Sequence, residues 1–588
     1  MSRCCRSAAG WASCPCGCRT IPPCKKSRCA CNHVWDAAVR RAGYKGPMSL
    51  ESPLRRIACA VAAMRGWRRW LLAALLGAGA GFAMPPWYVF PLMVVGLVGL
   101  LWLIDGTRVP EVEEADAAPP RQRPYRRSFG DGLLWGLGYF AVGSLWIIEA
   151  FSVPPADFVA LGPPIVGGLA VVLAIFVGLS CLSWTWLVRR RPRLGQGWLR
   201  VLLFAVLLAA FEWLRGHVFT GYPWNPFGHV WAFAAVTLQP AAWFGVYGLS
   251  ALTVALLTLP AALSDGRGRA VLIVGVLLLL PFVAAAPRVL LAAPSPNTGP
   301  MLRLVQPNIP QSEKWLWEMR DRHLAKMLDM STADRPADLR HVIWPETAVP
   351  FLLAQSPDYL RTVATVAPAD GYLLVGAPRG AMTVDEARVI SPGSARPQWN
   401  SLHAVDGKGF IRATYDKIHL VPLGEYLPLR HYYAFLADTI GRGSFEAGLE
   451  RRTMRLPGLP PVGVIICYEA IFPAAVVDPL DRPDWILNVT NDSWFGASSG
   501  PYQHMVSARL RAVEEGLPLV RVANTGISAI IDRFGRVEAQ LGMEKTGIID
   551  HNLPPPGPAT PFARFGDWSF LALLLLLALP GVYLANRN

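Results

Sequence analysis

Three reactive side chains each follow a short apolar run that is typical of a β-strand. Glu346 lies in HVIWPETAVPF, Lys417 in TYDKIHLVPLGEYLP and Cys467 in PVGVIICYEAIFP. A cysteine that closes a strand and opens a helix can be a nucleophile, because a helix N-terminus and a nearby cation favour the thiolate. A glutamate can take the thiol proton, and a lysine can stabilise the oxyanion formed when the thiolate attacks a carbonyl. Together, a cysteine, a glutamate and a lysine predict a reaction in which the cysteine attacks a carbonyl and forms an acyl-enzyme.

Each of the three residues also has an ordinary structural interpretation. A cysteine at the end of an apolar strand is often a small buried hydrophobe. Glu346 follows Trp-Pro and can be a carboxylate in the first turn of a helix, while Lys417 can be a surface charge. The catalytic hypothesis therefore requires a fold that brings the three side chains together.

The region that must position them, from about Arg288 to Gly566, has the pattern of an α/β domain. Its apolar runs are MLRLVQ, HVIW, YLLVGA, VGVIIC, WILNVT, PLVRVA and SAIID, separated by turn residues and by helix-like stretches such as His504–Glu515. A region of about 260 residues can bury one substantial core. We expect a catalytic domain over residues 300–555.

The rest of the chain has the composition of a membrane protein. Only 16% of the 588 residues are charged and 53% are hydrophobic, whereas a soluble domain has about 25% charged residues. Eight apolar stretches have about the length of a membrane helix. They are Trp67–Met84, Pro86–Ile104, Gly130–Phe151, Pro164–Val188, Trp198–Leu214, Leu238–Leu263, Ala270–Pro287 and Trp568–Ala585. We expect a seven-helix membrane domain over residues 65–288 and an eighth helix over 567–586.

The arginines predict the orientation of these helices. They cluster before the first helix and in alternate loops after it, at Arg65, Arg68, Arg69, Arg121, Arg123, Arg126, Arg127, Arg189, Arg190, Arg191, Arg193, Arg267 and Arg269. Positive charge marks the cytoplasmic side, so the net charge of +15 indicates membrane topology and not nucleic-acid binding. The α/β domain then lies outside the cytoplasm, and both termini lie in the cytoplasm. A miscounted helix would invert this arrangement.

The first 64 residues form a separate, cysteine-rich extension. Eight of the eleven cysteines precede residue 32, at irregular spacings that define no zinc site. We expect a disordered extension or the product of an upstream start codon. A metal-binding tail is the alternative.

Four longer segments carry a resemblance to a known family. They are EWLRGHVFTGYPWNPFG (Glu212–Gly228), VQPNIPQSEKW (Val305–Trp315), NVTNDSWFG (Asn488–Gly496) and RVANTGISAIID (Arg521–Asp532). With the Glu–Lys–Cys order, the α/β region resembles the nitrilase, or carbon–nitrogen hydrolase, superfamily. With the flanking helices, the chain resembles the apolipoprotein N-acyltransferase family. The resemblance implies an αββα sandwich domain joined to an α-helical bundle of eight membrane helices. It also implies a bacterial inner membrane, with the sandwich domain in the periplasm and both termini in the cytoplasm.

The resemblance also implies roles for individual residues. Glu346 matches the general base, Lys417 the oxyanion-stabilising lysine and Cys467 the nucleophile. The accessory positions are Glu425, Tyr468 and Glu469. Trp315 matches a substrate-binding tryptophan near the acyl-chain entrance.

The implied reaction is a two-step acyl transfer. Cys467 takes an acyl chain from a membrane phospholipid as a thioester, and the α-amine of an apolipoprotein's N-terminal diacylglyceryl-cysteine then accepts it. The partners are therefore a phospholipid donor, a lipid-modified protein acceptor and the membrane, with no nucleic acid. No metal or cofactor is expected, since the sequence has no P-loop or convincing dinucleotide motif.

The aromatic stretch Leu423–Phe445 suggests a lid that dips toward lipid, and an ordinary buried loop is the alternative.

Two other functions remain open at this level. A membrane-tethered amidase or nitrilase would share the acyl-enzyme but release the acyl group to water. A transporter with an appended binding domain is less favoured, because the apolar stretches have no obvious inverted repeat or run of ionisable residues.

Overall fold

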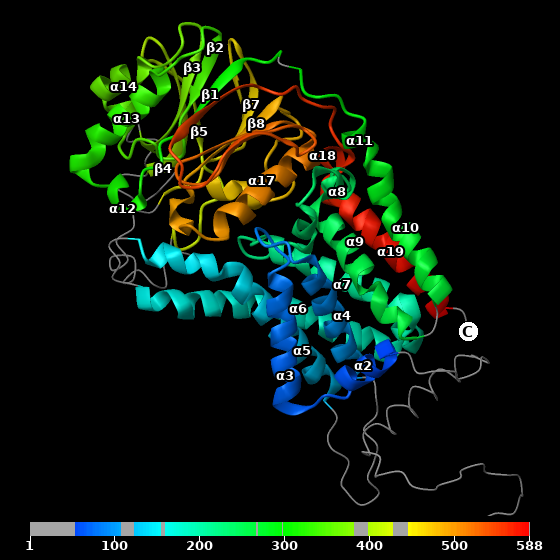
Figure 1. The fold of residues 1–588 in the computed structure, drawn as a ribbon. Helices are drawn as coiled ribbons and strands as arrows, with labels where there is room; N and C mark the ends of the chain where they lie inside the picture. Colours follow the sequence, from blue (N-terminus) through cyan, green and yellow to red (C-terminus); the bar gives the residue numbers. More distant parts are fainter. Residues whose placement is uncertain are drawn as a thin grey trace, which may run out of the picture.

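The computed structural model describes residues 53–107, 123–153, 159–265, 268–296, 298–381, 398–426 and 445–586. In Figure 1 a bundle of helices lies below an α/β domain. The chain enters this domain after α11 (Pro287–Leu290) and returns to the bundle through α18 (Pro561–Phe565). The predicted lid falls mostly on residues 427–444, which lie outside the described residues, as do residues 1–52.

Within the described residues, six helical segments are long and apolar enough to cross a membrane. They are Pro124–Phe151, Val159–Arg190, Gly197–His217, Ala241–Leu263, Gly268–Leu290 and Asp567–Leu584. Their main helices are α5 (Pro124–Ser144), α6 (Gly162–Arg190), α7 (Gly197–His217), α9 (Ala241–Leu263), α10 (Gly268–Ala285) and α19 (Asp567–Asn586). The first two predicted spans correspond to α3 (Gly66–Gly81) and α4 (Phe90–Asp105), of 16 residues each. These are shorter than the about 20 residues of a typical spanning helix. The structure thus supports six spans of the eight.

Buried ion pairs connect the short helices to the bundle. The Arg69 guanidinium on α3 donates to Asp131 on α5, with 2.7 Å between Nε and Oδ1. Arg200 on α7 pairs with Asp105 at the end of α4, at 2.8 Å. A buried charge in an apolar bundle requires such a partner. The same Arg69 contacts the carbonyl of Ala62, the last residue of α2 (Pro53–Ala62), which lies inside the predicted N-terminal extension.

The α/β domain contains two six-stranded sheets. The first has the order β12-β1-β2-β3-β4-β5 and the second β11-β10-β9-β8-β7-β6. The strands of the first are β1 (Met301–Gln306), β2 (Leu339–Ile343), β3 (Tyr372–Gly380), β4 (Gln398–Asp406), β5 (Ile411–Asp416) and β12 (Gly547–Asn552). Those of the second are β6 (Thr453–Leu456), β7 (Leu459–Ile466), β8 (Trp485–Thr490), β9 (Leu519–Ala523), β10 (Ser528–Ile531) and β11 (Val537–Leu541). The triplets β1-β2-β3 and β7-β8-β9 are parallel.

The two sheets pack face to face, with helices on their outer faces. Alternate residues point into the space between the sheets, as the two-residue period of a strand requires, and include Leu304, Ile343, Val464 and Ile466. Helices α13 (Arg320–Thr332) and α14 (Pro357–Ala364) cover the first sheet, and α17 (Gly500–Glu515) covers the second. The predicted α/β domain is confirmed, and the described residues form two sheets packed as a sandwich.

Helix α17 also forms the junction with the membrane bundle. Helix α9 is interrupted at Gly245 (φ 67°), and the N–H of the next residue, Val246, donates to the Glu514 carboxylate on α17 at 2.8 Å. At the other end of α17, Gln503 accepts a 2.7 Å hydrogen bond from the indole of Trp224. The second sheet is therefore fixed to the bundle through buried polar contacts.

We expect Gly245→Ala to destabilise the protein. Its positive φ disfavours an L side chain, and an added Cβ would lie 2.3 Å from the Phe562 ring. The expected loss is about 2–4 kcal/mol, measured as thermal unfolding of the detergent-solubilised protein. Gly168→Ala is the matched control, because a Cβ on this helical glycine meets nothing within 4 Å. Equal melting temperatures for the two variants would contradict this account of the junction.

Candidate active site

The carboxyl ends of strands from both sheets bring the three predicted reactive residues together. Glu346 follows β2, Lys417 directly follows β5 and Cys467 directly follows β7. The Lys417 ammonium lies 3.5 Å from Glu346 Oε1. The Cys467 thiol is near enough to both for their charges to act on it. A site at the carboxyl ends of parallel strands is usual for α/β sheets.

The Glu346 carboxylate accepts hydrogen bonds from three elements. Oε1 accepts from the Asn400 amide at 2.7 Å, in addition to its contact with Lys417, and Oε2 accepts from the backbone N–H of Asn491 at 2.8 Å. Glu346 is buried, so these donors replace the water that would otherwise solvate it. The arrangement orients the carboxylate as an acceptor, as a general base must be.

Glu425 is the second carboxylate on the lysine. Its Oε1 accepts from Lys417 at 2.9 Å and from Asn400 at 3.0 Å, so Asn400 bridges the two glutamates. Burial alone lowers the pKa of Lys417, but the carboxylates of Glu425 and Glu346 outweigh it and raise that pKa well above 10.5. Lys417 therefore stays protonated and keeps a fixed positive charge in the site.

Glu469 holds the turn that carries the nucleophile. Cys467 has a positive φ of 50° and begins a 3₁₀ turn, Cys467–Ile471. The Glu469 carboxylate accepts from the backbone N–H groups of Ile466 at 2.7 Å and Ile418 at 3.0 Å. It therefore joins the residue before Cys467 to the residue after Lys417. Its neighbour Tyr468 points to the membrane part and donates to the Gly221 carbonyl at 3.4 Å.

The surroundings of Cys467 do not favour a thiolate in the resting protein. Burial raises the pKa of the Cys467 thiol, the nearby Glu346 carboxylate raises it further, and Lys417 offsets only part of this rise. A desolvated thiol next to a negative charge keeps its proton. If Cys467 acts as a nucleophile, its thiol must lose the proton to a nearby base such as Glu346.

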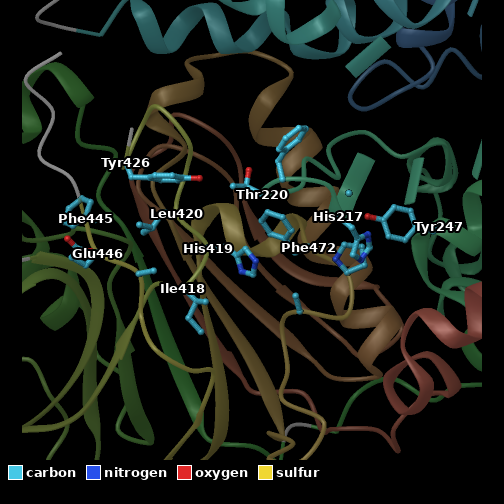
Figure 2. A pocket seen from close by; sticks show the side chains of 15 residues that line it. His217, Thr220, Tyr247, Ile418, His419, Leu420, Tyr426, Phe445, Glu446 and Phe472 are labelled. Atoms are coloured by element: carbon cyan, nitrogen blue, oxygen red, sulfur yellow. The ribbon is translucent and has the colours of Figure 1, made fainter. Parts of the chain in front are cut away.

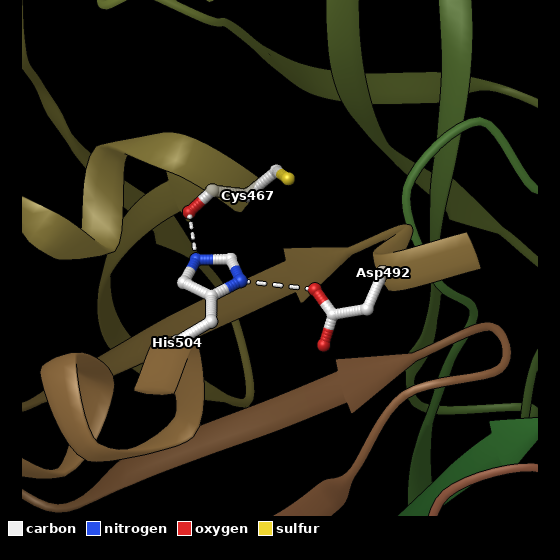
Figure 3. A group of neighbouring side chains, drawn as sticks. All are labelled: Cys467, Asp492 and His504. Atoms are coloured by element: carbon white, nitrogen blue, oxygen red, sulfur yellow. Dashed lines mark hydrogen bonds and ion pairs between the residues drawn. The ribbon is translucent and has the colours of Figure 1, made fainter. Parts of the chain in front are cut away.

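A buried histidine supports Cys467 from the other side (Figure 3). His504 Nε2 lies 2.9 Å from the Cys467 carbonyl oxygen, and Nδ1 lies 2.9 Å from Asp492 Oδ1. Arg521 contacts Asp492 at 2.6 Å and His504 Nδ1 at 3.1 Å. The Cys467 thiol, Asp492 and His504 are close enough for a metal ion, with ligand atoms within 4.8 Å. They do not suit one, because both ring nitrogens are engaged and a guanidinium already neutralises the carboxylate.

A cavity of about 620 Å³ lies between the α/β domain and the bundle (Figure 2). His217 and Tyr247 line it from membrane helices α7 and α9. Ile418 and His419, which follow Lys417, and Phe472, at the end of the Cys467 turn, line it from the α/β domain. An open space with apolar walls thus adjoins the reactive cluster at the boundary with the membrane part.

Trp315 does not join the cluster. It follows the short helix α12 (Gln311–Lys314), and its side chain is 52% exposed. The preceding residue, Lys314, is instead buried, and its ammonium donates to the Glu346 backbone carbonyl at 3.1 Å.

The sequence did not single out Lys314, Asn400, Asn491 or His504. Lys314 and Asn491 lie in segments that carry the family resemblance, but nothing in the sequence ranks one polar residue there above another. His504 lies in a helix-like stretch outside those segments. Asn400 lies in a polar strand with no such signal.

Comparison with known proteins agrees with this architecture. Residues 76–259 match the apolipoprotein N-acyltransferase N-terminal domain, and residues 301–557 match the carbon–nitrogen hydrolase family. The protein named apolipoprotein N-acyltransferase from Rhodopseudomonas palustris is 38% identical over 553 residues, covering 90% of this chain and 98% of that protein. The chain belongs to the apolipoprotein N-acyltransferase family.

Other members of the apolipoprotein N-acyltransferase family match over similar lengths. The protein of this name from Bradyrhizobium diazoefficiens is 39% identical, covering 91% of this chain and 98% of that protein. The one from Caulobacter vibrioides is 37% identical, covering 87% of this chain and 94% of that protein. The chain is thus an acyltransferase-family protein with a carbon–nitrogen hydrolase domain.

The raised thiol pKa predicts slow and strongly pH-dependent alkylation of Cys467. A free thiol ionises near about pH 8.5, and its reaction with iodoacetamide levels off above that value. We expect the alkylation rate of Cys467 at pH 8 to be at least about 10-fold lower than that of a free model thiol, and to keep rising toward pH 10. Peptide mass spectrometry measures the rate. If the Cys467 rate levels off at the same pH as the rate of a model thiol, or at a lower pH, the site favours the thiolate and this prediction is wrong.

Proposed function

We propose that this protein transfers an acyl chain from a membrane phospholipid to the N-terminal amine of a diacylglyceryl-modified apolipoprotein. The observation that carries the proposal is the buried Glu346–Lys417–Cys467 cluster, beside a cavity at the boundary with the membrane bundle. Membership of the apolipoprotein N-acyltransferase family supports the choice of substrates.

The first step forms a thioester. Glu346 takes the thiol proton, and the Cys467 sulfur attacks the ester carbonyl, whose oxygen becomes negative within reach of Lys417. When this intermediate collapses, the carbon–oxygen ester bond breaks. The departing glycerol oxygen receives the proton from Glu346 and leaves as the hydroxyl of a lysophospholipid.

The second step uses the same groups in reverse order. The α-amine of the lipid-modified cysteine attacks the thioester carbonyl, and Glu346 takes a proton from the amine. The carbon–sulfur bond breaks, the amide forms, and the thiolate recovers the proton from Glu346. No further reactant is required for either step.

Burial of the nucleophile favours transfer over hydrolysis. The Cys467 residue is only 7% exposed, so little water reaches a thioester formed there. In this proposal Glu425 fixes Lys417, Glu469 fixes the turn at Cys467, and Tyr468 fixes that turn to the membrane part. The exposed Trp315 contacts lipid near the entrance of the acyl chain.

The same proposal gives the protein eight membrane helices and a periplasmic catalytic domain. It assigns α3 and α4 as short spans, residues 65–288 as the membrane domain and residues 300–555 as the catalytic domain. The basic residues at the end of α6, Arg189 and Arg190, are then cytoplasmic. The residues around His217 face the periplasm.

Mass spectrometry tests the two chemical steps. We expect purified protein incubated with phosphatidylethanolamine to gain one acyl group on the Cys467 peptide, and to lose it to a diacylglyceryl-cysteine peptide added afterwards. Cys467→Ala should do neither, and Glu346→Gln should slow thioester formation by about 10²–10⁴-fold. Cys59→Ala, outside the catalytic domain, should match the wild type. Release of the acyl group as free fatty acid with acceptor present would identify a hydrolase, and no acylation of Cys467 would refute the proposal.

Fusion of green fluorescent protein to the C-terminus tests the topology, because this reporter fluoresces in the cytoplasm. We expect bright cells and, after protease treatment of spheroplasts, cleavage within the catalytic domain with a fluorescent C-terminal fragment retained. A dark fusion, or a domain protected until the membrane is broken, would reverse the proposed orientation.

A further inference from the structure

A second buried lysine lies in the reactive cluster. Lys314 is 3% exposed and comes from α12, outside the three segments that supply Glu346, Lys417 and Cys467. Its ammonium donates to the backbone carbonyl of Glu346 at 3.1 Å, the one hydrogen bond that the described residues give it. An ammonium has three N–H donors, so two of them have no acceptor among the described residues.

A second donor on the same helix is also unused. Gln311 lies one turn before Lys314, and its Oε1 accepts from the Asn491 side chain at 2.8 Å. Its Nε2 is buried and has no hydrogen-bond partner among the described residues. Helix α12 therefore presents surplus donors, one of them charged, beside the backbone groups that orient Glu346. A site with surplus donors suits developing negative charge.

The charges around Cys467 require a second cation. Glu346 and Glu425 share the single ammonium of Lys417, which leaves one negative charge in excess. The other buried carboxylates near the thiol are already paired, Asp492 with Arg521 and Glu469 with Arg451. A protonated Lys314 brings the Glu346–Glu425–Lys417 group to zero net charge. An unbalanced negative charge in a desolvated site would oppose formation of both the thiolate and the oxyanion.

We propose that Lys314 is a positioning residue of this active site, which holds the Glu346 backbone and supplies the cation that lets Cys467 lose its proton. The inference rests on the proposed function, because it assigns Glu346 and Cys467 their roles. Proton transfer from Cys467 to Glu346 then occurs within a cluster that is neutral before and after the transfer.

The ammonium of Lys314 is lost more easily than that of an ordinary lysine. Burial lowers its pKa to about 8, although the charges of Glu346 and Cys467 act in the opposite direction. The neighbouring Glu313 is turned outward to His323, at 3.5 Å. Lys314 is therefore charged below about pH 8 and neutral above it, so thioester formation should decline on the alkaline side of that value. Lys417, whose pKa is raised, does not titrate in this range.

The test follows thioester formation on Cys467 without acceptor, between about pH 6 and pH 10. We expect Lys314→Met to slow this step by about 10- to 100-fold near neutral pH and to abolish the alkaline decline. Lys314→Arg keeps a charge at all these pH values, so it should recover much of the rate and show no decline. Lys326→Met, on the surface of α13, is the matched control and should behave as wild type.

Iodoacetamide alkylation of Cys467 in the same variants separates this inference from the proposed function. If the wild type forms no thioester, the proposed acyl transfer is wrong. Slower alkylation of Cys467 in Lys314→Met would still support the role of the Lys314 charge in deprotonating the thiol. If Lys314→Met does not fold, Lys314→Arg provides the test. Loss of the alkaline decline in this variant supports the inference, and an unchanged decline contradicts it. Rates within about twofold of wild type for Lys314→Met, with the same pH profile, would overturn the inference.

Discussion

The contact on which the site depends is the buried ammonium of Lys417 between two glutamates. Its distances of 2.9 Å to Glu425 and 3.5 Å to Glu346 place three charges in a space from which water is largely excluded. Such a cluster is costly to bury and is stable only if every charge has partners. The bridging amide of Asn400 and the backbone N–H of Asn491 provide them. Asn400 lies in β4 of the first sheet and Asn491 follows β8 of the second, so the cluster requires the face-to-face packing of the two sheets.

Each sheet makes a different contribution to the chemistry. The first sheet and its loops supply the acidic and basic side chains, Glu346 and Lys417, whose partners hold them as acceptor and cation. The second sheet supplies the nucleophile and the groups that hold its backbone, Glu469 and His504. In the proposed reaction the proton acceptor and the thiol therefore approach each other from opposite layers of the sandwich.

The sequence predicted those parts of the fold whose physical signal is local. Seven apolar runs correspond to strands of the two sheets, and six apolar stretches correspond to helices long enough to span a membrane. Strands β4, β5, β6, β11 and β12 were not predicted. In β4 and β12, for example, QWNSLHAVD and GIIDHN mix polar residues into the pattern. Glu346, Lys417 and Cys467 were selected from their types, their positions after strands and the family resemblance, and the structure brings them together. Lys314 and His504 were not, because their importance arises from contacts between segments distant in sequence, to Glu346 and to Cys467.

Helix α17 links the backbone of Cys467 to the helical bundle. One side of the helix bears His504, which contacts the carbonyl of the nucleophile, and its two ends bear Gln503 and Glu514, which bond to the membrane bundle. The backbone of Cys467 is thus one hydrogen bond away from an element that is itself fixed to the bundle. The helical bundle therefore serves as a wall of the α/β domain, and a shift of helix α9 or of the Trp224 loop would reach the Cys467 backbone through this single helix.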